Sequence, residues 1–111
     1  MEGEGKITRF VVVERRRFID GRDPGYDWTA IVSNMMYRER KAVEGVVASL
    51  AEDQENVFLS DIMERDGIGI DEARASGEVE VERAFGYARI AFGGSIASYT
   101  VVELVDGDCL L

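Results

Sequence analysis

Residues 28–52 read WTAIVSNMMYRERKAVEGVVASLAE, and their apolar side chains recur at spacings of three and four. This spacing is typical of one face of a helix that packs against a core. It predicts an amphipathic helix over 28–52, with Asp27 as its N-cap and Tyr26 stapled onto Ile31. The apolar positions are Trp28, Ile31, Val32, Met35, Met36, Ala42, Val43, Val46, Val47 and Leu50.

The beginning of this stretch also fits a strand. Over residues 26–33 the apolar side chains of Tyr26, Trp28, Ala30 and Val32 recur at every second position, which is the period of a half-buried strand. The helix is favoured because its own pattern continues beyond residue 33. The strand stays open as the alternative for this segment.

Strands are predicted on both sides of the helix. Residues 6–19 are rich in β-branched and aromatic side chains, which favours a long first strand. From Glu78 onward valine alternates with glutamate, and the extended character continues to Phe92 with an interruption at Gly86. The Gly-Gly-Ser sequence that follows predicts a hairpin turn into a return strand over 96–105.

The remaining segments predict turns and short helices. Residues 20–25 read DGRDPG, and a proline followed by glycine favours a type II turn. Short helices are predicted over 61–66 and 72–76, each followed by a glycine that can end it. The whole pattern predicts an α+β fold in the order β-α-(short helices)-β-β, with an antiparallel sheet of three or more strands packed on one long amphipathic helix.

Length and composition favour one compact unit. The chain has 111 residues, of which 46% are hydrophobic and 32% charged, so we expect a single α+β domain over 6–111 after a disordered N-terminus, 1–5. The longest apolar run, Phe10 to Val13, is far below the roughly 20 residues that cross a bilayer. The first residues lack the features of a secretory signal. These observations predict a cytoplasmic protein without a membrane partner.

Charge is distributed unevenly along the chain. The net charge is −9, which disfavours direct binding to nucleic acid at long range. Segment 6–41 nevertheless has nine basic and five acidic residues, whereas segment 42–111 has four basic and fifteen acidic residues. A local basic surface can therefore bind an anion or an acidic partner, and the two halves can attract each other between copies.

The chain contains no histidine and one cysteine. Histidine is the commonest general acid or base near neutral pH and the commonest metal ligand. Its absence excludes a Ser-His-Asp catalytic triad or a Cys-His catalytic pair, and it argues against a zinc site. We therefore predict no catalytic residues, no metal and no cofactor.

Two basic clusters are candidate anion sites. Arg15 and Arg17 share one face of the first strand, where they can grip a phosphate or carboxylate. Arg38 and Lys41 share one face of the predicted helix at positions i and i+3. If the fold brings the two clusters together, an anionic ligand becomes the expected occupant.

Aromatic and acidic residues supply two further candidate sites. Tyr26 and Trp28 lie beside the predicted turn, where their rings can stack on a flat ligand. Glu78, Glu80 and Glu82 form a row on one strand face at a spacing of about 7 Å. This row can imitate a phosphate backbone, although a solvated strand face is the favoured explanation.

The missing histidine, the split charge and the exposed sheet edges favour a non-enzymatic oligomeric binding protein, most simply a homodimer, that holds an anionic small ligand or a protein partner. An acidic inhibitor that mimics nucleic acid and blocks a basic enzyme is one alternative. A small enzyme that uses Asp, Glu or Arg without a metal is another.

Overall fold

The computed structural model describes residues 8–19, 25–32 and 38–105. The expectations for residues 1–5, for most of the turn over 20–25 and for Met35 and Met36 lie outside these ranges. Within them the protein has the predicted α+β fold, in which a five-stranded antiparallel sheet packs on one long helix. Neither helix combines the length and the apolar content needed to cross a membrane.

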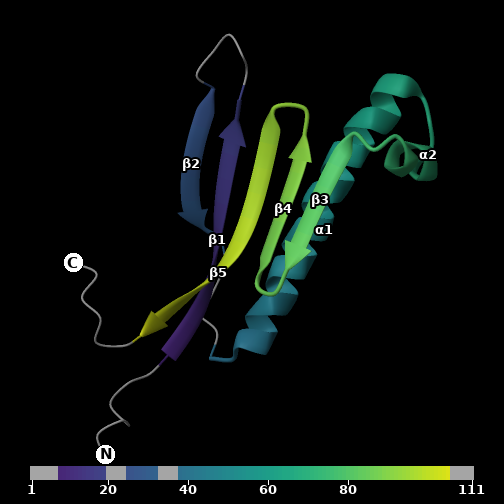
Figure 1. The fold of residues 1–111 in the computed structure, drawn as a ribbon. Helices are drawn as coiled ribbons and strands as arrows, with labels where there is room; N and C mark the ends of the chain where they lie inside the picture. Colours follow the sequence, from purple (N-terminus) through teal and green to yellow (C-terminus); the bar gives the residue numbers. More distant parts are fainter. Residues whose placement is uncertain (1–7, 20–24, 33–37, 106–111) are drawn as a thin grey trace, which may run out of the picture.

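The sheet has the order β2-β1-β5-β4-β3, and every pair of neighbouring strands is antiparallel. Figure 1 shows the long helix α1 lying toward the β3 and β4 side of the sheet, while β2 forms the opposite edge. The elements are β1 (Thr8–Phe18), β2 (Tyr26–Ile31), α1 (Arg40–Asp66), α2 (Ile70–Ala75), β3 (Val79–Ala84), β4 (Tyr87–Phe92) and β5 (Ser95–Val105).

The predicted helix over 28–52 is wrong in its first part. Residues Tyr26–Ile31 form β2, which pairs along its whole length with β1, so the strand alternative is correct here. Asp27 lies inside this strand and caps no helix, and Tyr26 stacks on Phe18 at a ring distance of 6.0 Å. Pairing with β1 outweighs the local helical spacing, because the side chains in this segment are mostly β-branched or aromatic.

The helix instead begins at Arg40 and continues to Asp66. Residues 61–66, predicted as a separate short helix, are its last part. The apolar spacing predicts an end near residue 52, whereas the helix continues with a polar residue, Gln54, at a buried position. The helix ends at Gly67, whose φ of 65° is the left-handed conformation that glycine adopts readily. The second short helix is α2, which begins at Ile70 rather than at residue 72.

Two hairpins connect the last three strands. The prediction of one extended segment through Gly86 is wrong, because Phe85 and Gly86 form a turn between β3 and β4. Gly86 has a φ of 71°, which most other residues adopt only at a cost in energy. The predicted turn after Phe92 is confirmed, with Gly93 at a φ of 60° and β5 as the return strand.

The core lies between one face of the sheet and α1, which contacts β4, β5, β1 and β3. Buried positions along α1 follow the helical period, so that one stripe meets alternate residues of the central strands. The main cluster consists of Val12, Val43, Val47, Ala51, Phe58, Ala88, Ile90, Ala97 and Tyr99.

Candidate functional site

A buried polar cluster lies between β1, β5 and α1. Glu14 and Arg16 are two residues apart on β1 and therefore point to the same face of the sheet, toward the helix. The Arg16 Nη2 atom lies 3.0 Å from a carboxylate oxygen of Glu14. Arg16 also donates hydrogen bonds to Oε1 of Gln54 on α1 and, over 3.3 Å, to the hydroxyl oxygen of Tyr99 on β5.

Most of the cluster is shielded from water, whereas the Arg16 side chain is 31% exposed. Glu14 is 8% exposed, Gln54 6% and Tyr99 2%. Burial, and secondarily the neighbouring Glu14 carboxylate, raises the pKa of Tyr99 well above its usual range, so its phenol stays protonated at neutral pH. Every buried side-chain nitrogen and oxygen in the described residues has a hydrogen-bond partner. The cluster therefore orients α1 on the sheet and leaves no buried polar atom for a ligand.

The predicted anion contacts Arg15 and Arg17 lie on the opposite face of the sheet from this cluster. Arg15 donates two hydrogen bonds to the two carboxylate oxygens of Asp27 on β2, at 3.0 and 2.7 Å. Arg17 approaches the same carboxylate at 4.0 Å. The hydrogen bonds from Arg15 lower the pKa of Asp27. This carboxylate already takes the position that a bound anion would occupy.

The second predicted basic pair lies elsewhere. Arg38 precedes α1 and Lys41 lies in the first turn of the helix, so they are not both in mid-helix as predicted. Both side chains are exposed. Arg40, between them in sequence, pairs with Glu44 at 3.0 Å. Lys41 lies on α1, which packs on one face of the sheet, whereas Arg15 and Arg17 point to the opposite face, so the fold does not bring them together.

Tyr26 and Trp28 lie on β2, on the sheet face that carries α1, and Figure 1 shows β2 at the edge of the sheet away from the helix. Trp28 stands across from Arg16 in the strand register. Tyr26 is 48% exposed and Trp28 43%. All six residues of β2 are exposed, so this strand presents an aromatic surface at the edge of the sheet.

The backbone of β2 also offers hydrogen-bonding groups at this edge. The N–H of Val32 donates to the carbonyl of Val12, its register partner on β1, over 2.9 Å. Because antiparallel partners alternate between hydrogen-bonded and non-bonded pairs, the backbone groups of Asp27, Thr29 and Ile31 point away from β1. No strand within the described ranges pairs with this outer edge.

Only part of the predicted row of Glu78, Glu80 and Glu82 is free to contact a partner. Glu78 precedes β3 and accepts two hydrogen bonds from Arg65 of α1, at 3.1 and 2.7 Å. Glu80 and Glu82 lie on β3, the other edge strand, with both side chains exposed. Of the three predicted carboxylates, two therefore remain on an open surface.

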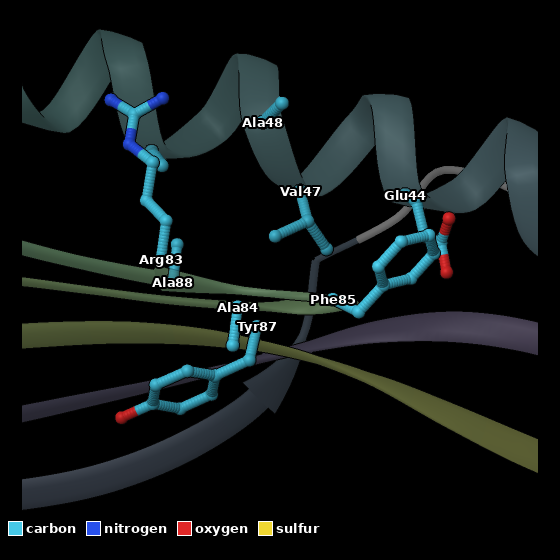
Figure 2. Close-up of a pocket in the computed structure, with 10 residues that line it drawn as sticks. Glu44, Val47, Ala48, Arg83, Ala84, Phe85, Tyr87 and Ala88 are labelled. Carbon is cyan, nitrogen blue, oxygen red and sulfur yellow. The ribbon is translucent and has the colours of Figure 1, made fainter.

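A shallow pocket of about 220 Å³ lies between α1 and the β3–β4 hairpin. In Figure 2 the Phe85 ring turns toward Glu44 of the helix, while Tyr87 points away on the other side of the sheet. The two charged residues at its rim have partners, since Arg83 bonds Glu55 at 3.2 Å and Glu44 bonds Arg40. The pocket is therefore a mostly apolar surface without converging polar groups.

The described residues contain no group of three acidic or cysteine side chains that could hold a metal ion. Comparison with protein-family models, with curated proteins and with solved structures finds no match for this chain. The candidate site must therefore be judged from its own geometry.

The sequence reasoning missed the buried cluster. A glutamate and an arginine at positions i and i+2 after a run of valines signal that one strand face becomes polar where it meets another element. Gln54 breaks the apolar stripe of the helix and marks the partner position. These two signals together identify the contact between β1 and α1, but neither is specific when taken alone.

Proposed function

We propose that this chain is a non-enzymatic binding protein that acts as an oligomer and joins a protein partner through the outer edge of β2. The observation that carries the proposal is this edge strand. It has six exposed residues, two large aromatic side chains and outward backbone groups at Asp27, Thr29 and Ile31. Such an edge is a ready template for an added strand.

Charge supports a protein partner over an anionic small ligand. Asp27 already pairs with Arg15 at 2.7 Å and approaches Arg17 at 4.0 Å, and Glu14 already pairs with Arg16. An anion would have to displace a carboxylate from each of these positions, which costs the interactions already made. An added strand displaces no strand of the described sheet, because it uses the outward backbone groups of β2.

The described residues of β2 also lack the features that usually block strand addition. Native sheets protect their edges with lysine, proline, bulges or inward-pointing charges. The sequence of β2, YDWTAI, has one charged residue, and that residue is held by Arg15. The strand β3 at the other edge carries exposed Glu80 and Glu82, which do protect it.

The proposal is tested with a proline that removes one outward donor. The N–H of Thr29 points away from β1, so Thr29→Pro keeps the β1–β2 hydrogen bonds and blocks the outer edge. Thr29→Val is the matched control, because it keeps both the N–H and the shape of the side chain. Wild type and both variants are immobilised and exposed to an extract of the cells that make the protein.

A partner held by wild type and Thr29→Val but lost with Thr29→Pro supports strand addition. In that complex, amide hydrogen exchange at Asp27, Thr29 and Ile31 slows, while the exchange of β3 amides is unchanged. Retention of the same proteins by all three baits, or protection confined to β3, contradicts the proposal.

A further inference from the structure

We infer that the partner of β2 is a second copy of this chain, and that two β2 strands pair antiparallel about a two-fold axis at Thr29. The inference rests on the proposed function, since it uses the same outer edge. The pairing makes one continuous sheet through both copies, with an α1 helix on the same face at each end. A two-fold axis is the commonest symmetry of protein oligomers.

The outward backbone groups select the register. A two-fold at Thr29 sets Thr29 opposite Thr29 of the second copy and sets Asp27 opposite Ile31. Each of these pairs exchanges both N–H···O=C bonds, so every outward group of β2 obtains a partner. A two-fold axis at Trp28 would leave the outward backbone groups of Ile31 without a partner in the β2 strand of the second copy. A two-fold axis at Ala30 would leave those of Asp27 without one.

The side chains fit the same register. On the face that carries α1, Trp28 of one copy lies opposite Ala30 of the other, so the largest side chain of the strand lies next to the smallest. On the other face the two Thr29 residues lie opposite each other, a pairing that favours sheets. The two Asp27 carboxylates lie toward opposite ends of the junction, and each keeps its own Arg15.

The electrostatics disfavour the equivalent contact at the other edge. Strand β3 carries Glu80 and Glu82, and the chain as a whole has a net charge of −9. If two β3 strands paired, the glutamates of one copy would lie next to those of the other across the junction. Like charges in such positions destabilise a sheet. Strand β2 is the one edge of the described sheet where two copies meet without this repulsion.

The first test is the oligomeric state of the purified full chain. Sedimentation equilibrium is run on wild type, Thr29→Val, Thr29→Pro and Thr29→Lys from micromolar to millimolar concentration. We expect a dimer for wild type and Thr29→Val. The dissociation constant rises at least about tenfold for Thr29→Pro, which loses the central backbone donor in both copies. Thr29→Lys, which sets two cations opposite each other and keeps every backbone group, weakens the dimer even if the proline variant fails to fold.

The second test fixes the register. In a Cys109→Ser background, Thr29→Cys places two thiols at a Cα separation of about 5.5 Å across the axis, within the range that a disulfide spans. Ala30→Cys is the matched control, because its copies are diagonal neighbours about 7 Å apart. Rapid oxidation of Thr29→Cys to a covalent dimer, with little for Ala30→Cys, supports the inference.

Three results overturn the inference: a monomer at every concentration, a dimer that both Thr29→Pro and Thr29→Lys leave intact, or crosslinking at Ala30→Cys in place of Thr29→Cys. The proposed function is separable from it. A monomeric purified protein that still holds a different partner sensitive to Thr29→Pro contradicts the second copy and the oligomeric part of the proposed function, and it keeps strand addition at β2. If the Thr29 variants change neither the dimer nor the partners captured from the extract, both the inference and the proposed function are wrong.

Discussion

Arg16 and Glu14, two residues apart on β1, point to the same face of the sheet and form an ion pair of 3.0 Å beneath α1. The side chain of Glu14 is 10% exposed and that of Arg16 is 31% exposed. A carboxylate in such a position depends on its cation, because water no longer compensates its charge. The pair, with Gln54 and Tyr99, connects the helix to the middle of the sheet.

Replacing Arg16 by methionine is expected to lower the free energy of unfolding by about 3 kcal/mol, because Glu14 then remains buried without its cation. The measurement is equilibrium urea unfolding followed by circular dichroism. Arg38→Met is the matched control, since Arg38 is solvent-exposed before α1 and should change the midpoint little. The double variant Glu14→Gln/Arg16→Met should recover much of the loss. A single Arg16→Met variant as stable as wild type would contradict the assigned role.

Alkaline pH should expose the environment of Tyr99. Burial raises the pKa of this phenol well above its usual range. A raised folded-state pKa means that the contribution to stability is complete below about pH 10 and is lost as the pH rises further. Tyr99→Phe should therefore show a flatter decline in stability above pH 10, together with a loss of about 1 kcal/mol at neutral pH from the missing hydroxyl. Tyr87→Phe, on the other face of the sheet, should keep the slope of the wild type.

Acid pH should act on the junction between β1 and β2. Hydrogen bonds from Arg15 lower the pKa of Asp27 below its usual value. A lowered folded-state pKa means that the stabilisation is present above about pH 4 and is lost as the pH falls through the folded value. Asp27→Asn should reduce this loss, as measured by urea midpoints between neutral and strongly acid pH. Asp53→Asn on the exposed side of α1 is the control, and an equal effect of both variants would argue against the ion pair.

Gly45 offers a stabilising substitution. It lies inside α1, and a Cβ added there meets no atom within 4 Å. Gly45→Ala is expected to raise the free energy of unfolding by about 0.5–1 kcal/mol, because alanine loses less backbone entropy in a helix. Gly67→Ala provides the opposite control, since Gly67 has a φ of 65° and alanine there should cost about 1 kcal/mol. Thermal unfolding of both variants checks the contrast, and equal shifts would contradict it.

Much of the local structure was predictable because it depends on residues close in sequence. The alternation of valine and glutamate from Glu78 predicted a strand, and the glycines after Phe92 predicted the hairpin that leads into β5. The spacing of Val43 and Val47 predicted a helix face. Tyr26–Ile31 was harder, because its side chains fit both periods and the pairing with β1 decides between them.

The candidate site was less predictable, since its contacts join distant parts of the chain. Arg16 meets a glutamine 38 residues away and a tyrosine 83 residues away. The predicted anion site at Arg15 and Arg17 instead meets Asp27, a residue first assigned to a helix cap. Once that segment becomes a strand, the carboxylate comes to lie beside the two arginines.

The sequence by itself determined the element types over most of the chain, the face of each strand residue and the surplus of acid in the second half. These properties follow from periods of two and of 3.6 residues and from composition, which act locally. Only the tertiary structure decided that α1 covers four of the five strands, which charges neutralise one another and that β2 ends the sheet with its outer backbone groups open. Strand order and charge pairing depend on which distant segments pack together, and a local sequence pattern does not specify those contacts.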